Sequence, residues 1–84
     1  MVKVYLFIEL VGSAEADDVV AKLKSLQLDG CQFANVVVLA DDKIVAQLDC
    51  ETGESATAAI LERISAVDGV VQTNVIAAVR PVRK

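Results

Sequence analysis

The sequence has no histidine and no tryptophan, and its 84 residues include only three aromatic side chains, one proline and two cysteines. Without histidine the chain lacks the most common general base and the most common zinc ligand. Two segments without charge, Cys31–Ala40 and Val70–Val79, are ten residues long each, whereas a membrane-spanning helix needs about 20 mostly apolar residues. The sequence also contains no glycine-rich phosphate loop and no Ser-His-Asp set. We therefore expect no catalytic residues, no metal, no cofactor and no membrane span.

The charge balance excludes further classes of protein. Eight basic residues stand against twelve acidic ones, for a net charge of −4, so no broad positive surface is available to bind nucleic acid phosphates. With 55% hydrophobic and 24% charged residues, the chain is typical of a folded domain. Its length predicts a single domain over residues 1–84. Glu9 interrupts the apolar stretch that a signal peptide would need, so we expect a cytoplasmic protein.

Hydrophobic periodicity predicts four strands and two helices. Apolar residues alternate through the first strand, and they recur at three- and four-residue spacing in the two helices. Ser13 is a suitable N-cap for the first helix, and two Asp-Gly pairs end the helices. The expected strands are Val2–Leu10, Cys31–Leu39, Lys43–Cys50 and Val70–Val79, and the expected helices run from Ala16 to Leu26 and from Thr52 to Val67.

An internal repeat indicates how these elements are arranged. Leu28-Asp29-Gly30 followed by Asn35-Val36-Val37 recurs 39 residues later as Val67-Asp68-Gly69 followed by Asn74-Val75-Ile76. Two related β-α-β halves predict an α+β, ferredoxin-like β-α-β-β-α-β fold. This fold has a four-stranded antiparallel sheet with both helices on one face, and the other face, here called the open face, is left without cover.

Strand alternation predicts that this open face is unusually apolar. The expected side chains on it include all three aromatics of the chain and two aliphatic residues: Tyr5, Phe7, Phe33, Val45 and Ile76. Large exposed apolar patches are rare on soluble monomers. We therefore predict that a second copy covers the open face in a homodimer or larger oligomer, forming a dimeric α+β barrel. The alternative is a monomer with a mildly apolar face.

The repeat also predicts the positions of the two cysteines. Cys31 is expected on the open face and Cys50 toward the helices, so their side chains should point to opposite sides of the sheet. A disulfide requires the two Cβ atoms to approach within about 4.5 Å. The pattern therefore predicts free thiols, with a redox or metal role as the alternative.

From Glu62 onward the chain resembles the C-terminal half of the Lrp/AsnC-type ligand-binding domain, also called the domain for regulation of amino-acid metabolism, and the earlier elements fit that domain in pattern. The residues that carry the resemblance are Ile64, Val67-Asp68-Gly69-Val70, Thr73, Ile76 and Val79-Arg80-Pro81-Val82. The resemblance implies a non-catalytic module of transcription regulation that dimerises through its sheets and senses small molecules such as amino acids. It further implies Asp42 and Thr73 as ligand-binding residues, and a related full-length regulator as a partner. Because the chain starts at the first strand, we expect the stand-alone form without a DNA-binding domain.

Other families share the expected topology. The Asp29-Gly30-Cys31 turn resembles the cytoplasmic maturation chaperones of periplasmic nitrate reductase, which hold a twin-arginine signal peptide. The acidic balance of the chain suits such a basic ligand. Gly12 after the first strand would suit amino-acid-binding domains of the ACT type. A small dimeric α+β-barrel enzyme is a further alternative, although the absence of histidine disfavours it.

Overall fold

The computed structural model of the protein describes residues 1–80. Pro81 and Val82, which were expected to end the sheet pattern and to complete the C-terminal match, lie outside these residues. Along the chain the elements are β1 (Val2–Leu10), α1 (Ala16–Ser25), β2 (Cys31–Ala40), β3 (Lys43–Cys50), α2 (Gly53–Ala58), the π-helical segment η1 (Ala59–Ile64) and β4 (Val70–Val79). α2 and η1 follow each other directly and occupy most of the second helix expected from the sequence.

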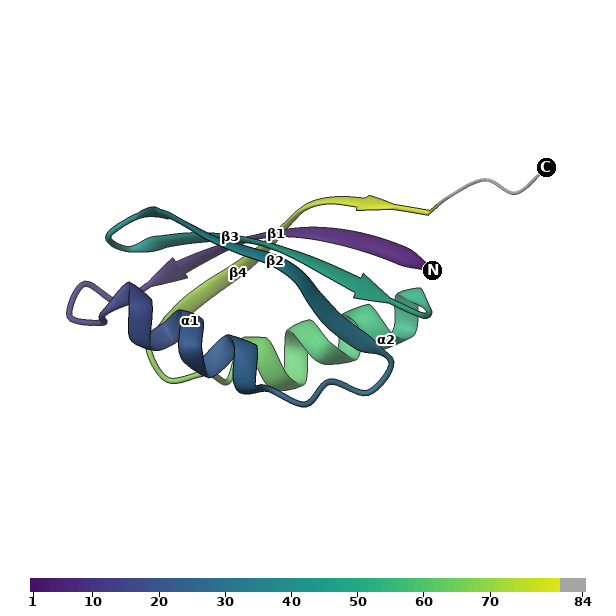
Figure 1. The fold of residues 1–84 in the computed structure, drawn as a ribbon, viewed down its shortest axis with the longest axis horizontal. Helices are drawn as coiled ribbons and strands as arrows, with labels where there is room; N and C mark the ends of the chain where they lie inside the picture. Colours follow the sequence, from purple (N-terminus) through teal and green to yellow (C-terminus); the bar gives the residue numbers. More distant parts are fainter. Residues whose placement is uncertain (81–84) are drawn as a thin grey trace.

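The four strands form one antiparallel sheet in the order β2-β3-β1-β4. In Figure 1 α1 and the α2–η1 segment both lie beneath this sheet, while no helix of residues 1–80 lies on its upper surface. The structure is therefore a two-layer α+β fold, compatible with a ferredoxin-like arrangement. The open face expected from the sequence corresponds to this upper surface.

The core lies between the sheet and the helices, and the predicted periodicity accounts for it. Alternate residues of the two central strands point into it, because side chains on a strand alternate between faces. The buried strand residues are Val4, Leu6, Ile8, Leu10, Ile44, Ala46, Leu48 and Cys50, and the buried helix residues are Val19, Leu23, Ala56, Ala59, Ile60, Ile64 and Val67. The predicted inward side of Val2–Leu10 and the predicted stripe of the second helix are thus confirmed.

The helix ends differ in how well the sequence predicts them. The N-cap of α1 is Glu15, without a side-chain hydrogen bond, so the prediction of Ser13 as the cap was wrong. The cap of α2 is Thr52, whose Oγ1 accepts a hydrogen bond of 3.0 Å from the backbone N–H of Ser55. Both helices end before the Asp-Gly pairs that were expected to end them, α1 at Ser25 and η1 at Ile64. Gly69 lies in the connection from η1 to β4 with a φ of 98°, and a Cβ there would lie 3.1 Å from Val19 Cγ2. This turn therefore requires glycine.

β-Bulges in both edge strands change the side to which several residues point. In β2, Phe33 pairs with Leu48 and Asn35 pairs with Gln47, so Ala34 is an extra residue. The extra residue reverses the alternation, because a shift of one position moves a side chain to the other face. Phe33 and Cys31 consequently point toward the helices, and both pack against the core. The prediction that they lie on the open face was wrong.

A similar bulge interrupts β4. Val75 pairs with Leu6 on the side of the helices, whereas Ala77 pairs with Tyr5 on the open face, which leaves Ile76 as the extra residue. The sequence predicted one unbroken alternation, with Ala77 and Val79 toward the helices. That prediction was wrong beyond Ile76, because Val79 pairs with Lys3 on the open face. It was also wrong at the start of β4, where a second bulge at Val71 leaves Val70 paired with Leu10 and packed against the core.

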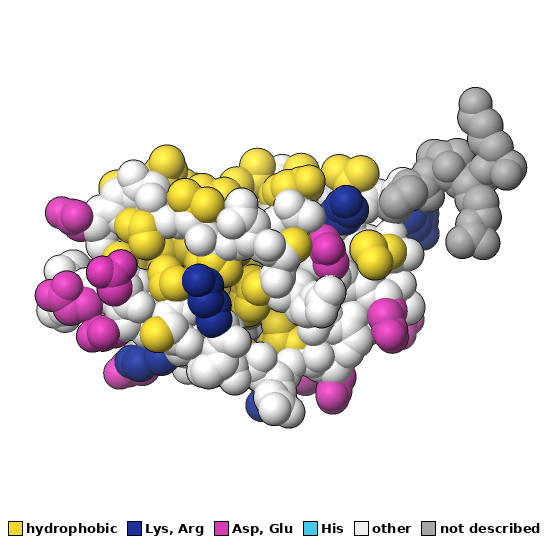
Figure 2. Space-filling view, in the orientation of Figure 1, with side chains coloured by type: hydrophobic (Ala, Val, Ile, Leu, Met, Phe, Trp, Pro, Cys, Tyr) yellow, Lys and Arg dark blue, Asp and Glu magenta, His cyan; other side chains and the backbone are white. Residues whose placement is uncertain are grey.

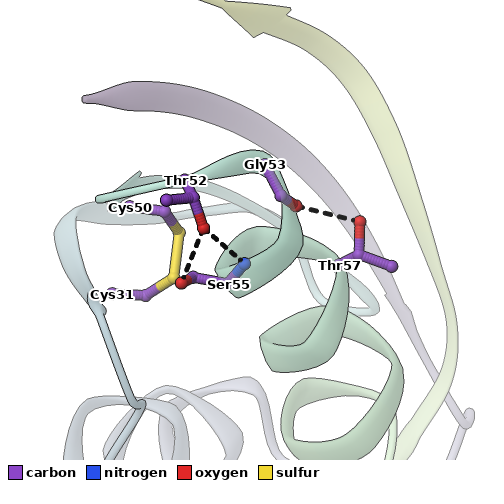
Figure 3. Close-up of a disulfide and its surroundings, with 6 residues drawn as sticks. All are labelled: Cys31, Cys50, Thr52, Gly53, Ser55 and Thr57. Atoms are coloured by element: carbon purple, nitrogen blue, oxygen red, sulfur yellow. Dashed lines mark hydrogen bonds between the residues drawn. A yellow bond between two sulfur atoms is a disulfide. The ribbon is translucent and has the colours of Figure 1, made fainter.

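The bulge at Ala34 brings the two cysteines together. Cys31 and Cys50 are register partners with Cα atoms 4.1 Å apart, and they form a disulfide with an S–S distance of 2.10 Å. Figure 3 shows this bond beside the Thr52–Ser55 cap of α2. The Glu51 N–H also donates a 2.8 Å hydrogen bond to the Gly30 carbonyl. The prediction of free thiols on opposite faces was wrong, because it assumed an uninterrupted β2.

Reduction of the disulfide should destabilise the fold. The bond closes a loop with a sequence separation of 19, and a cross-link of this length lowers the entropy of the unfolded chain by an amount worth about 3 kcal/mol. We expect dithiothreitol to lower the free energy of unfolding by about that amount, as measured by urea denaturation. The double variant Cys31→Ala/Cys50→Ala should show no response to reductant. Equal stability before and after verified reduction of the wild-type protein would contradict this prediction.

Candidate functional site

The open face has an apolar centre on the two middle strands. Tyr5 lies opposite Gln47, and Phe7 lies opposite Val45. All four side chains are half-buried, although no helix of the described residues covers them. In Figure 2 hydrophobic side chains gather along the upper surface of the molecule, on the side of the sheet away from the helices. Towards the β2 edge the centre continues into Val37, which pairs with Val45 and is 48% exposed.

The structure brings together three of the five predicted interface residues. Tyr5, Phe7 and Val45 are neighbours on β1 and β3. Ile76 occupies the bulge of β4 with 57% of its surface exposed. Phe33 is excluded, because it packs against the core under the sheet. The apolar face therefore exists, but only two of the three aromatic residues belong to it.

Four charged residues at the ends of β1 and β3 border this centre. At one end Lys3 pairs with Asp49, and at the other Glu9 pairs with Lys43. All four are half-buried. Sequence reasoning did not include them in the site, although they share the strand alternation of Tyr5 and Val45 and could have been found from it.

The two predicted ligand-binding residues do not share a site. Asp42 is exposed in the β2–β3 turn, where its carboxylate lies 3.1 Å from Lys43 Nζ and its backbone oxygen accepts a hydrogen bond from the Leu10 N–H. Thr73 pairs with Ile8 in β4, so its side chain is on the side of the helices. Its hydroxyl is buried, with no hydrogen-bond partner among residues 1–80. The two side chains thus lie on different elements and in different surroundings.

Neither of two hollows on the surface of the described residues is lined by both Asp42 and Thr73. One hollow, of about 870 Å³, lies on the outside of the second helix and is lined by Thr52, Glu54, Leu61 and Glu62 among others. A second hollow of about 450 Å³ lies between the start of α1 and the β2–β3 turn, and four carboxylates line it: Glu15, Asp17, Asp41 and Asp42. Asp42 thus contributes to an acidic hollow that Thr73 does not line. Within residues 1–80 no cluster of histidine, cysteine or carboxylate side chains has an arrangement suited to a metal ion.

Comparison with known proteins gives no family for the chain: no family model matches it, and no curated protein or solved structure is significantly similar to it. The resemblance to the Lrp/AsnC-type domain therefore stays a prediction. None of the helices in residues 1–80 is both long enough and apolar enough to cross a bilayer.

The buried hydroxyl of Thr73 gives a test of its role. Burying a hydroxyl without a hydrogen bond costs about 1–3 kcal/mol. We therefore expect Thr73→Val to raise the free energy of unfolding by about 1 kcal/mol, measured by urea denaturation. Thr57→Val is the matched control, because the Thr57 hydroxyl donates a 3.0 Å hydrogen bond to the Gly53 carbonyl, and it should give no gain. A loss of stability in Thr73→Val would show that the hydroxyl is needed for the fold.

Proposed function

We propose that this protein is a non-catalytic assembly module that forms a homodimer through the open face of its sheet. In this proposal each chain is a ferredoxin-like β-α-β-β-α-β subunit of a dimeric α+β barrel. The observation that carries the proposal is the uncovered apolar centre formed by Tyr5, Phe7 and Val45 on the two middle strands.

The size of the open face suits a second copy of the chain. Strands are about 4.8 Å apart and rise about 3.4 Å per residue, so four strands of about eight residues present roughly 500 Å² in projection. A specific interface buries about 800 Å² of accessible surface on each partner, and a rugged face of this projected size can supply such an area. Two stacked sheets also bury the apolar side chains of both copies in one step.

Sensing of a small amino acid is a further part of the proposal, and the Lrp/AsnC resemblance supports it. In a single subunit Asp42 and Thr73 belong to different surroundings. Ligand binding would therefore require groups contributed by more than one copy. A related full-length regulator is the corresponding protein partner, and through it the module would act on transcription without binding DNA itself.

The cellular location stays a prediction. A cytoplasmic protein is expected to keep its thiols reduced, whereas disulfides persist in oxidising compartments. The Cys31–Cys50 bond therefore favours an oxidising compartment. In the cytoplasm this pair would spend most of its time as two thiols.

The variant Phe7→Glu tests the assembly proposal. It places a charge at the centre of the open face, so we expect the wild-type dimer to become a folded monomer in light scattering. Leu61→Glu is the matched control, because Leu61 is 68% exposed on the helix layer, and this variant should keep the mass of the dimer. Circular dichroism of each variant checks that it is folded. A folded Phe7→Glu variant with the mass of the wild-type dimer would rule out this interface.

A second candidate function is that of a chaperone for a twin-arginine signal peptide. The acidic hollow that Glu15, Asp17, Asp41 and Asp42 line favours it, because clustered carboxylates attract a basic peptide.

Titration calorimetry with a synthetic twin-arginine signal peptide distinguishes this function from assembly alone. If the chaperone function holds, we expect binding at peptide concentrations of about 100 μM or below, and much weaker binding to the variant Asp41→Asn/Asp42→Asn. A peptide with both arginines replaced by lysine is the control for nonspecific charge attraction. No heat of binding to the wild-type protein would exclude the chaperone function.

A further inference from the structure

The charges on the open face are arranged so that they match a second copy of the same face. On β1 a base and an acid stand at opposite ends, Lys3 and Glu9, and on β3 the order is reversed, with Asp49 beside Lys3 and Lys43 beside Glu9. Each end of the strand pair therefore has one charge of each sign, and charges of the same sign lie diagonally across the face. Tyr5, Phe7, Val45 and Gln47 fill the centre between them.

Two-fold symmetry turns this arrangement into contacts between opposite charges. If the symmetry axis runs along the strands, β1 lies over β3 of the second copy, so Lys3 faces Asp49 and Glu9 faces Lys43. If the axis runs across the strands, β1 lies over β1 of the second copy, so Lys3 faces Glu9 and Asp49 faces Lys43. Both arrangements give four contacts between opposite charges, because a closed dimer uses the same surface on both copies.

A crossed arrangement of the two sheets would lose these contacts. Lys3 and Glu9 are six residues apart, so each lies about 10 Å from the centre of the face. If the strands of the two copies cross at about 90°, this distance of about 10 Å runs across the strands of the second copy. It then corresponds to about two spacings between neighbouring strands. The charged residues would then lie over the edge strands of the second copy, where Val37, Asn35, Ala77 and Asn74 share the open face. They would be desolvated without an opposite charge to face.

The charged residues are available for contacts between copies. The ion pairs within 4.0 Å in the described part of the chain are Lys22–Asp68 and Lys43–Asp42, so neither Lys3 nor Glu9 is held in one. Asp49 accepts a 3.1 Å hydrogen bond from Gln47 Nε2 and retains further acceptor capacity, since a carboxylate has about four lone-pair sites. Lys43 contacts Asp42 at an exposed turn, where a single ion pair contributes little.

From these observations we infer that two copies stack with aligned strands and recognise each other through the four end charges of β1 and β3. The inference rests on the proposed dimer and adds its orientation and its selectivity. The charged ends disfavour partners that lack the same alternating arrangement, since like charges brought together across an interface are costly. The occupant of the open face is therefore a second copy of this chain.

Two charge-reversal variants test the inference. Lys3→Glu/Lys43→Glu makes all four end positions acidic, and Glu9→Lys/Asp49→Lys makes them all basic. We expect each variant alone to self-associate at least tenfold more weakly than the wild-type protein in sedimentation equilibrium. An equimolar mixture should form a heterodimer, detected by native mass spectrometry, because either direction of the two-fold axis then places acidic ends against basic ends.

A control separates these local contacts from net charge. Lys24→Glu/Arg63→Glu makes the chain more acidic by the same amount at exposed positions on the helices, and it should dimerise like the wild-type protein. The wild-type dimer should also dissociate more readily as NaCl rises from about 50 to 500 mM, because salt screens the end charges.

The outcomes separate this inference from the proposed function. A monomeric wild-type protein would overturn the dimer itself. A wild-type dimer whose two reversal variants self-associate as strongly as before would overturn only the aligned, charge-matched orientation. A mixture of folded variants that gives no heterodimer would likewise overturn only the aligned, charge-matched orientation. If a double reversal does not fold, the single change Lys3→Glu is mixed in its place with Asp49→Lys and, separately, with Glu9→Lys. A heterodimer is expected with Asp49→Lys if the axis runs along the strands, and with Glu9→Lys if it runs across them. No heterodimer in either mixture would overturn the aligned orientation.

Discussion

Burial of one side of the sheet under the two helices is the constraint from which the rest of the structure follows. β1 and β3 are the central strands, and their inward residues lie at the base of a single core. The elements of residues 1–80 form two layers, the sheet and the helices. The outward side chains of the same strands are therefore left at the surface, even where they are aromatic. The apolar open face is thus a direct consequence of a two-layer fold, in which burying one face leaves the other exposed.

The outward residues of the central strands combine two properties that support assembly with a like partner. An apolar centre supplies nonspecific attraction, which depends on the area removed from water. The alternating charges at both ends supply direction, because they match only in certain orientations. Attraction without direction would favour disordered aggregation of this face. The end charges without the apolar centre would give only weak binding, since exposed ion pairs contribute little.

The fold was predictable from the sequence in those strands and helices whose hydrophobic periodicity shows which side chains point to the core. Val2–Leu10 alternates clearly, and Ala56, Ile60, Ile64 and Val67 recur at helical spacing. The edge strands lack such a signal, because Cys31–Ala40 and Val70–Val79 are uncharged and largely apolar on both faces. The position of a bulge depends on the register against the neighbouring strand, and a strand pattern taken alone does not contain it. The bulge at Ala34 explains why Phe33 was misplaced and why the disulfide was missed.

The disulfide has a consequence for chain connectivity. Together with the β2–β3 turn it closes the hairpin Cys31–Cys50 into a covalent ring, so β2 is attached to the sheet at both ends. Cleavage of the backbone at the exposed Asp41–Asp42 turn would leave the two strands joined through sulfur. Backbone continuity at this turn is therefore dispensable for holding β2 beside β3. β2 is thus an edge strand that is covalently joined to β3 at both of its ends. Its hydrogen bonds to β3 cannot open progressively from one end of the strand while the other end stays paired.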